Sequence, residues 1–459
     1  MPKARWCRRC NSRLCRFCRK RKTIIGSCRN SRHRRHLRIS SNGRNDGILQ
    51  EETAMNEELK WIENAIKSLA KTAVKDGFYW RASYTPEDCS GVALLQKWME
   101  DAGFQTRFDQ VGNLYGRIQG KTDTVFLTGS HRDTVAGGGH YDGALGIITA
   151  IAAGGALYRA YGTPEMTLEV VALCEEEGSR FLSGYVGSRA ISGMLSDSDL
   201  QEQDADGISL RDALSACGYY NGELPMPRKD VSQFLELHIE QGGILEKTKQ
   251  QIGIVTTIVG LLVGDIIFHG LQNHAGTTPM SLRCDPVPAA ASFIEILNHW
   301  ALSKGSDLVC TIGNITVEPG KSNVIAGKVT LTFDIRSGDQ LLLDEAKEML
   351  QSLLEKFPAY KPELVYACQE PPAPMDTEGI DTLATLAEKQ NAAWTKIASG
   401  AGHDSQIIAP KIKTNMIFVP SKDGISHSPD EFTSLKDIAP GYALMKAYMK
   451  EVVWQRKEK

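Results

Sequence analysis

The sequence predicts an α/β protein in which a discontinuous domain, a mixed sheet flanked by helices, carries a smaller inserted α+β domain. Two observations lead to this fold class. Strand-like apolar runs alternate with helical stretches over residues 55–257, and the same alternation is found over 370–459. Between these segments, residues 258–369 follow a β-α-β-β-α-β order, which is typical of a small ferredoxin-like domain.

In the first domain, three apolar runs end where polar residues begin. They are TVFLTGS (124–130), LEVVALCEEEG (168–178) and FLELHIEQG (234–242). Each run has the β-branched or apolar composition of a buried strand. Ligands bind outside the carboxyl ends of the strands in open α/β sheets, so the sequence predicts a functional site where these runs end.

The inserted domain is predicted from three strand patterns and two helical stretches. The strand patterns are GDIIFHG, CTIGNITVEPG and KVTLTFDIRS, and the helical stretches are PVPAAASFIEILNHWALS and LLLDEAKEMLQSLLEKF. The Pro-rich segment QEPPAPMD (369–376) then reads as a linker that returns the chain to the first domain.

Residues 1–54 depart from this pattern and form a basic, cysteine-rich and arginine-rich tail. The first 45 residues carry 16 Lys/Arg and no Asp or Glu. The tail also holds Cys7, Cys10, Cys15, Cys18 and Cys28. A zinc module that binds nucleic acid is one interpretation, but the cysteine pairs are close together and few apolar residues could pack around a metal. A secretory signal would need an apolar core. We favour a disordered tail, or a translation start at Met55, where an amphipathic helix pattern begins.

The composition of the whole chain excludes several classes of protein. Its 459 residues suffice for two or three domains, and 42% hydrophobic and 24% charged residues are typical of globular proteins. No apolar run approaches the roughly 20 residues that span a bilayer. The net charge is −2, and the basic tail leaves the remainder acidic, which argues against nucleic acid as its partner. The cysteines outside the tail lack paired spacing, which indicates reduced thiols in a cytoplasmic protein.

The first candidate metal ligands follow the run that ends at residue 130. His131 and Asp133 lie at its end, and Asp142 follows in the glycine-rich loop GGGHYDGALG. Imidazole and carboxylate groups suit Zn²⁺ or Mn²⁺, and a carboxylate can bridge two such ions. We expect Asp133 to orient the His131 imidazole rather than to bind a metal. A solvated polar loop is the structural alternative for this motif taken alone.

The segment CEEEGSRF places Glu175, Glu176 and Glu177 at the end of an apolar strand. Adjacent buried carboxylates raise one another's pKa, and burial adds to the cost, unless cations compensate them. One carboxylate can then ligate a metal while its neighbour acts as a general base. A charged helix cap is the structural alternative.

Two histidines extend this set of candidate ligands. His238 in ELHIEQG ends one apolar run, and His427 in GISHSPDE follows the last one. Each histidine alone is more often structural than catalytic. Four strand ends of this kind in one α/β domain favour two metal sites that share one bridging carboxylate.

Together these motifs resemble those of the M20 metallopeptidase-like amidases, within the group of allantoate amidohydrolase, N-carbamoyl-L-amino acid hydrolase and β-ureidopropionase. The resemblance runs from about residue 60 to the C-terminus through GSHRDTVAGGGHYDGALG, EEEGSRF, ELHIEQG, NHAGTTPMSLRCDP and GISHSP. It implies two Mn²⁺ or Zn²⁺ ions per subunit in the discontinuous domain, and a homodimer formed through the inserted domain, which moves as a lid. It implies Glu176 as the catalytic base. The metal ligands that it implies are His131, Asp142 as the bridge, Glu177, His238 and His427.

The resemblance also implies contacts with a small ureido substrate. His274 in NHAGTTP would lie near the metals, or reach the active site of a neighbouring subunit, and stabilise the developing oxyanion. Asn323 in SNVIAG and Arg336 in FDIRS are implied substrate contacts, and Arg336 suits bidentate capture of a carboxylate. Gln241 and His403 are further implied contacts. A turn residue and a surface ion pair are the structural alternatives for Asn323 and Arg336.

The reaction that the resemblance implies is direct attack of water on a ureido carbonyl, with Glu176 carrying the proton to the leaving nitrogen. VALCEEEGSRF, SGAGHDSQ and RFDQVGNLYGRIQG are most similar to allantoate enzymes, so hydrolysis of allantoate to ammonia and carbon dioxide in ureide nitrogen recovery is the first choice. Leu261, Leu262 and Val263 stand where a Gly-Gln-Arg-Arg-like stretch is expected, which favours N-carbamoyl-L-amino acids as the alternative. A ligand-binding relic without catalysis and a nucleic-acid binder acting through the tail are the alternatives from other classes.

Overall fold

The computed structural model describes residues 43–75 and 77–455 of the chain. The chain divides into two units, residues 1–54 and residues 55–459. The interpretations offered for the cysteines of the tail lie outside the described residues.

The first helix of the described chain is longer than its sequence pattern predicts. We expected a helix from Met55, whereas α1 (Gly43–Thr72) begins earlier. Its side chains Ile62, Ile66 and Leu69 are buried in the main hydrophobic core. The turn-by-turn spacing of these three side chains is that of an amphipathic helix with one face on the core.

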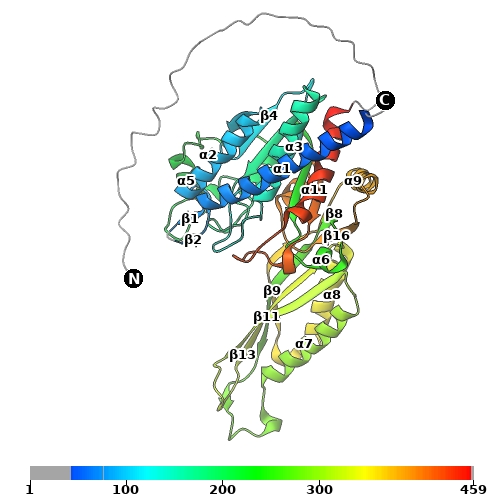
Figure 1. Ribbon diagram of the computed structural model, residues 1–459. Coiled ribbons are helices and arrows are strands. Elements are labelled where there is room, and N and C mark those ends of the chain that lie inside the picture. Colours follow the sequence, from blue (N-terminus) through cyan, green and yellow to red (C-terminus); the bar gives the residue numbers. More distant parts are fainter. Residues whose placement is uncertain (1–42, 76, 456–459) are drawn as a thin grey trace, which may run out of the picture. The chain divides into compact units, whose positions relative to one another are not determined.

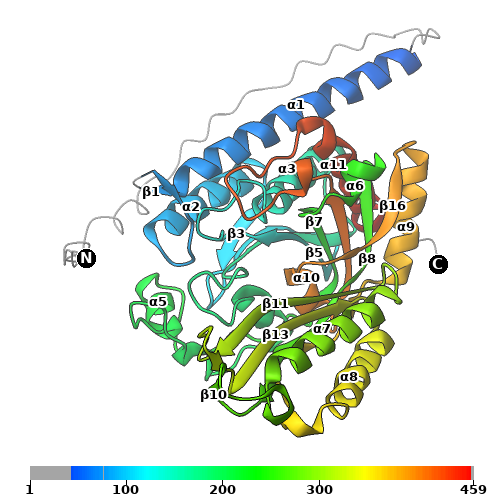
Figure 2. The ribbon, with the colours of Figure 1, turned by 90° about the horizontal axis from the view of Figure 1, so that it is seen from below.

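A nine-stranded mixed sheet forms the centre of the second unit (Figure 2). Neighbours pair in the order β15-β8-β17-β7-β5-β6-β4-β3, and β16 lies beside β8. The adjacent strands β17, β7, β5 and β6 are mutually parallel. The strands are β3 (Gln105–Phe108), β4 (Leu114–Ile118), β5 (Thr122–His131), β6 (Met166–Leu173), β7 (Val231–Ile239), β8 (Ile252–Ile258), β15 (Ala373–Pro374), β16 (Trp394–Ser399) and β17 (Lys413–Val419).

Helices cover both faces of this sheet. Figure 2 shows α2, α3 and α11 on one side and α10 on the other. α9 packs with the first group, and α4 contacts α10. Helix α3 is long and apolar enough to cross a membrane, but it is largely buried against β5, β6 and β7 as the central core helix. The helices are α2 (Pro86–Asp101), α3 (Ala144–Tyr161), α4 (Val186–Ser192), α9 (Thr377–Lys389), α10 (Asp404–Ile408) and α11 (Leu435–Met449).

The segment between β8 and β15 forms a second sheet with its own hydrophobic core. Its strands pair in the antiparallel order β11-β13-β9-β14, and α7 and α8 lie on one face (Figure 1). The chain order β9-α7-β11-β13-α8-β14 is the β-α-β-β-α-β order that the sequence predicts. The elements are β9 (Gly260–His269), β10 (Asn273–His274), α7 (Pro286–Leu302), β11 (Leu308–Glu318), β12 (Val324–Ile325), β13 (Lys328–Ser337), α8 (Gln340–Leu354) and β14 (Glu363–Glu370).

The remaining elements are short. A third core cluster packs Leu210 and Leu214 of α5 against Phe181 and Val186, so α5 supports the loop that follows β6. These elements are β1 (Val74–Lys75), β2 (Phe78–Tyr79), α5 (Leu210–Ala216), α6 (Ile244–Thr248), four 3₁₀ turns (Asp199–Gln201, Met280–Leu282, Pro358–Tyr360 and Lys422–Gly424) and a π-helical turn (Lys450–Trp454).

A buried ion pair holds the chain directly after β5. The Arg132 guanidinium donates to both carboxylate oxygens of Asp88 at 2.8 and 3.1 Å, and to the carbonyl of Gly112 at 2.7 Å. Arg132→Met leaves the buried Asp88 charge without its partner, so we expect the free energy of unfolding to fall by about 3–5 kcal/mol in urea denaturation. Lys97→Met, which breaks the exposed Lys97–Asp101 pair, should change it by less than about 1 kcal/mol. Equal effects of the two substitutions would contradict the prediction.

Candidate active site

Four neighbouring parallel strands bring their carboxyl ends to one edge of the nine-stranded sheet. β5 ends at His131, and His238 is the penultimate residue of β7. The loops after β6 and β17 carry Glu176, Glu177 and His427. Because the four strands are adjacent and parallel, the segments at their ends converge.

Asp142, from the glycine-rich loop before α3, lies between the three histidines. Its Oδ1 atom is 3.3 Å from His131 Nε2 and 3.0 Å from His238 Nε2. Its Oδ2 atom is 3.2 Å from His427 Nε2, which lies 3.5 Å from Glu177 Oε2. The two oxygens of one carboxylate therefore face two different groups of side chains.

Two sets of metal-ligating atoms share Asp142. His131, Asp142 and His238 form one set, and Asp142, Glu177 and His427 form the other, with the ligand atoms of each set within 4.8 Å of one another. Imidazole nitrogens and carboxylate oxygens are the donors that Zn²⁺ and Mn²⁺ take in proteins. Within the described part of the chain, the buried Glu177 Oε1 atom has no hydrogen-bond partner, and a cation would satisfy it. These residues therefore fit a pair of divalent cations.

The ionisable groups of this cluster have strongly shifted pKa values. Burial would raise the pKa of Asp142, but hydrogen bonds with the three histidines outweigh it and hold the pKa well below 3.8. Burial would lower the pKa of His131, but Glu176 and Asp142 outweigh it and raise the pKa well above 6.5. Burial and then Asp142 raise the pKa of Glu177 to about 7. Large opposed shifts within one cluster are characteristic of functional sites.

Glu176 lies beside the two sets of ligands. Its Oε2 atom is 4.0 Å from His131 Nε2, and its side chain lines the cavity on which the cluster opens. Burial raises the pKa of the Glu176 carboxyl well above 4.5, against the opposing charge of His131. A carboxyl group with a raised pKa, placed next to a reacting water, can take up a proton and release it again.

Asp133 lies beside the His131 imidazole, with its Oδ1 atom 4.0 Å from His131 Nδ1, and makes closer contacts as well. The His131 Nδ1 atom lies 3.1 Å from the carbonyl oxygen of Asp133, so the backbone of Asp133 is the nearer partner of the imidazole. The Asp133 carboxylate accepts hydrogen bonds from the backbone N–H groups of Glu176 and Glu177, each at 3.1 Å. Asp133 thereby holds the turn that carries these two glutamates.

Glu175 has a structural role that distinguishes it from the two glutamates that follow it. Its Oε1 atom accepts hydrogen bonds from the backbone N–H groups of Arg180 and Phe181 at 3.0 and 2.7 Å. These contacts close the loop after β6. Of the three consecutive glutamates, two therefore face the cluster and one stabilises the loop.

Gln241 and His403, two expected substrate contacts, line the same cavity. Gln241 Nε2 donates to Asp142 Oδ2 at 2.9 Å. His403 Nε2 lies 2.9 Å from Ser399 Oγ, and its ring centroid lies 4.5 Å from that of His238. Burial and then the neighbouring His238 hold the pKa of His403 well below 6.5, so this imidazole is neutral.

The other three expected contacts lie in the four-stranded sheet region and do not line the cavity. His274 in β10 is exposed, and its Nδ1 atom accepts the backbone N–H of Gly276 at 3.0 Å. Asn323 is exposed, and its carbonyl accepts the backbone N–H of Ala275 at 3.0 Å. His274 and Asn323 therefore lie close together, in β10 and in the turn before β12.

Arg336 is the member of this group that reaches the segment beside the cavity. Its Nε and Nη2 atoms donate to the two carboxylate oxygens of Asp334 at 2.8 Å each, and its Nη1 atom donates to the Gly400 carbonyl at 2.9 Å. The surface ion pair, which is the structural alternative for Arg336, is thus present. Since a guanidinium has five N–H groups, one on each terminal nitrogen is left for a further acceptor.

Glu431 is a positioning residue that the sequence analysis did not identify. Its Oε1 atom accepts the backbone N–H groups of Tyr141 and Asp142 at 2.9 and 3.1 Å, and its Oε2 atom accepts the Ser426 hydroxyl at 2.8 Å. It therefore ties the Asp142 loop to the loop of His427. The sequence feature that could have identified Glu431 is its position in GISHSPDE, four residues after His427.

Several residues at the site have a strained backbone. Four non-glycine residues at the site have a left-handed backbone, with φ angles of 51° at Glu175, 51° at Tyr185, 55° at Gln241 and 52° at His427. Such conformations cost about 1–3 kcal/mol each and persist where the surrounding structure holds side chains in position for function.

The cluster opens on a cavity of about 220 Å³. The cavity is bounded by the turn after β6, the start of α4 and the segment between β16 and α10. Its lining residues are His131, Asp142, Glu176, Glu177, Gly178, Leu182, Ser183, Gly184, Tyr185, Gln241, Ala401, Gly402, His403 and His427.

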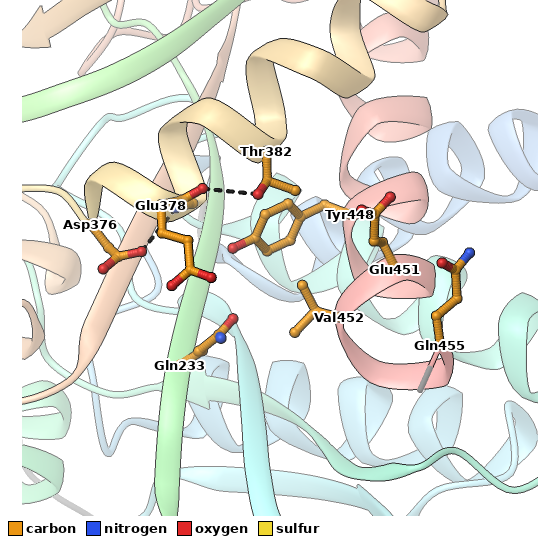
Figure 3. Close-up of a pocket in the computed structure, with 9 residues that line it drawn as sticks. Gln233, Asp376, Glu378, Thr382, Tyr448, Glu451, Val452 and Gln455 are labelled. Carbon is orange, nitrogen blue, oxygen red and sulfur yellow. Dashed lines mark hydrogen bonds between the residues drawn. The ribbon is translucent and has the colours of Figure 1, made fainter. Parts of the chain in front are cut away.

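A second cavity, of about 230 Å³, lies between β7, α9 and the end of α11 (Figure 3). Gln233 places it at the amino end of β7, whereas the metal-ligating histidine lies at the carboxyl end. Asp376, Glu378 and Glu451 make its wall acidic, and Lys413 pairs with the first two. Its lining contains no histidine or cysteine, so the metal-ligand chemistry of the described residues belongs to the first cavity.

Comparison with known proteins agrees with this site. The family model described as peptidase family M20/M25/M40 matches residues 118–451. The chain is 39% identical over 413 residues to an allantoate amidohydrolase of Escherichia coli (strain K12), covering 88% of this chain and 98% of that protein. It is 34% identical over 399 residues to an N-carbamoyl-L-amino-acid amidohydrolase of Paenarthrobacter aurescens, covering 85% and 97%.

Solved structures show the same likeness. A hydantoinase/carbamoylase family amidase from Burkholderia multivorans superposes with a TM-score of 0.80 at 31% identity, covering 85% of this chain and 97% of that chain. The aminopeptidase PepT from Bacillus cereus, at 18% identity and a TM-score of 0.58, shares the fold alone. The chain therefore belongs to peptidase family M20/M25/M40 and is a hydrolase of the amidohydrolase group within it.

Proposed function

We propose that this enzyme cleaves a ureido C–N bond of allantoate, with release of ammonia and carbon dioxide. The observation that carries the proposal is the pair of ligand sets that share Asp142, with Glu176 beside them at the cavity. Identities of 39% and 38% to the allantoate amidohydrolases of Escherichia coli and Bacillus subtilis support allantoate as the substrate. The proposed metal ligands are His131, Asp142, Glu177, His238 and His427.

Two divalent cations held by these residues, Mn²⁺ or Zn²⁺, would polarise the ureido carbonyl and ease deprotonation of the attacking water. Glu176 takes the proton from the water and returns it to the leaving nitrogen. Asp133 keeps Glu176 in place through the backbone hydrogen bond at 3.1 Å. The raised pKa of the Glu176 carboxyl suits a group that must hold this proton between the two steps.

The remaining proposed contacts would bind the carboxylate and the reacting ureido group of the substrate. The two N–H groups left on Arg336 suit the substrate carboxylate. Gln241 and His403 lie at the cavity wall, where they can hydrogen-bond the ureido group. Asn323 and His274 would join the site from the inserted domain, with His274 stabilising the developing oxyanion.

N-carbamoyl-L-amino acids are the second candidate substrates, and the register of the four-stranded sheet favours them. Leu261 pairs with Arg336 on one side and with Glu370 on the other. Leu262 is buried under the helices, whereas Leu261 and Val263 lie on the opposite face. Apolar side chains beside a carboxylate-binding arginine would suit the side chain of an amino acid.

We also propose that residues 258–369 form a lid and dimerisation domain on a catalytic domain of residues 55–257 and 370–459. β11 lies at the edge of the four-stranded sheet, and its Val309 and Ile315 are 58% and 54% exposed. An edge strand with exposed apolar side chains can pair with the same strand of a second copy, which supports a homodimer.

We place the enzyme in the cytoplasm. The six cysteines among the described residues are free, and all of them except the buried Cys174 are at least partly accessible. Free thiols of this kind persist where the surroundings are reducing.

The proposal is tested by a panel of ureido substrates offered to chelated enzyme that is reconstituted with each cation. We expect ammonia release from allantoate only after Mn²⁺ or Zn²⁺ is restored, and a kcat/KM at least about tenfold lower for N-carbamoyl-L-amino acids. The reverse preference would transfer the assignment to the second candidate. Failure to hydrolyse either substrate with either cation would contradict the proposal.

A further inference from the structure

One polar side chain at the cavity has no hydrogen bond within the protein. The polar lining side chains outside the metal-ligand set and Glu176 are Ser183, Tyr185, Gln241 and His403. Three of them have protein partners, which are Glu202 for Ser183, Asp142 for Gln241 and Ser399 for His403. Among the described residues, the Tyr185 hydroxyl has no such partner. It is therefore free to bind a substrate group.

Tyr185 is held firmly at the wall of the cavity. It directly precedes α4, has a left-handed backbone with φ of 51°, and donates its backbone N–H to the Glu176 carbonyl at 3.2 Å. A Cβ atom on Gly402 would lie only 2.2 Å from the Tyr185 hydroxyl, so the end of the phenol abuts that glycine. The main chain of Tyr185 is thus bound to the turn that carries Glu176, whereas its hydroxyl lies against Gly402.

The segment that meets the Tyr185 hydroxyl also receives Arg336. The Gly400 carbonyl accepts the hydrogen bond from Arg336 Nη1 at 2.9 Å, and Gly402 follows two residues later. Two residues of extended chain span about 7 Å. The phenol and the guanidinium therefore approach the two ends of the same short segment, residues 400–402.

The proposed function leaves one substrate group without an assigned contact. The assignment of Tyr185 to that group rests on the proposed function. A ureido carboxylate carries the scissile ureido group, the carboxylate and a third substituent on one carbon atom. With the scissile group beside Glu176 and the carboxylate at Arg336, the third substituent would lie against the rest of the cavity lining, which includes Tyr185 and Leu182. In allantoate this substituent is a second ureido group, and in an N-carbamoyl amino acid it is the side chain.

We propose that the Tyr185 hydroxyl binds the second, non-reacting ureido group and so makes the enzyme select bis-ureido carboxylates over N-carbamoyl amino acids with apolar side chains. A phenol can donate to a ureido carbonyl oxygen and accept from a ureido N–H. Burial and then the nearby Glu176 and Asp404 carboxylates raise the pKa of Tyr185, so the hydroxyl keeps its proton. An apolar side chain would gain nothing from this hydroxyl.

The test compares Tyr185→Phe with the unmodified enzyme on allantoate and on N-carbamoyl-L-leucine. We expect kcat/KM for allantoate to fall about tenfold, mainly through KM, and kcat/KM for the N-carbamoyl amino acid to change less than about twofold. Tyr161→Phe is the matched control, because Tyr161 is an exposed residue at the end of α3, outside the cavity. It should change neither value.

Binding of both compounds by calorimetry, in a Glu176→Gln background, is the second readout. Tyr185→Phe should weaken the binding of allantoate alone. Equal losses on both compounds, or no loss on allantoate, would overturn the assignment of Tyr185 while leaving the proposed function intact. Failure of the unmodified enzyme to bind or hydrolyse either compound would overturn both.

Discussion

Glu176→Gln is expected to lower kcat for ureido hydrolysis by roughly 10³-fold while KM changes little. The substitution keeps the size of the side chain and its place at the cavity, but an amide cannot take the proton from water. Glu176 could form a third ligand set with His131 and Glu177, but it is outside the two sets that share Asp142, so an unchanged metal content is expected if it acts as the base. Steady-state assays of ammonia release and elemental analysis of the same preparations measure both quantities.

Glu175→Gln is the matched control for this experiment. It makes the same chemical change one residue earlier, at a side chain that accepts backbone hydrogen bonds in the loop after β6. A glutamine oxygen can still accept these bonds, so we expect kcat to remain within about twofold of the unmodified enzyme. Full activity of the Glu176 variant, or an equal loss in both variants, would exclude Glu176 as the base.

Asp142→Asn is expected to lower the bound metal below one ion per chain and to reduce kcat/KM by more than about 10³-fold. The Asp142 carboxylate lies within 3.3 Å of three imidazole nitrogens, and its two oxygens face both sets of ligands. An amide of the same shape offers one neutral oxygen, so it cannot bridge two cations. Metal analysis after dialysis against buffer without metal gives the direct measure.

Asp376→Asn provides the control for this loss of charge. Asp376 caps α9 and lines the cavity at the far end of β7, and asparagine is an equally good cap. We expect its metal content and activity to match those of the unmodified enzyme. Two ions per chain in the Asp142 variant would show that this carboxylate does not bridge them.

The parts of the fold that could be predicted from the sequence are those with a local signal. The apolar run of β5 ends at polar residues, and the runs of β6 and β7 end in the same way, so their carboxyl ends could be recognised one at a time. The β-α-β-β-α-β order of the smaller sheet could be read from alternation and helical spacing. The start of α1 could not be predicted, since residues 43–54 lack the apolar periodicity that appears after Met55.

Side-chain roles that depend on distant partners were harder to predict. The proximity of Asp133 to the His131 imidazole follows from their positions in the sequence, but the hydrogen bonds of its carboxylate to the turn after another strand do not. Glu431 contacts a loop nearly three hundred residues away. No periodicity in the chain reports either contact.

By itself, the sequence determined which segments are strands, where each one ends, and that imidazole and carboxylate groups stand at those ends. Only the tertiary structure decided that Asp142 lies between the three histidines, that Glu175 turns away from the cluster, and that the Tyr185 hydroxyl meets the segment that binds Arg336. The physical reason is that strand patterns arise from neighbours along the chain, whereas these contacts depend on strand order and loop packing between segments far apart in it.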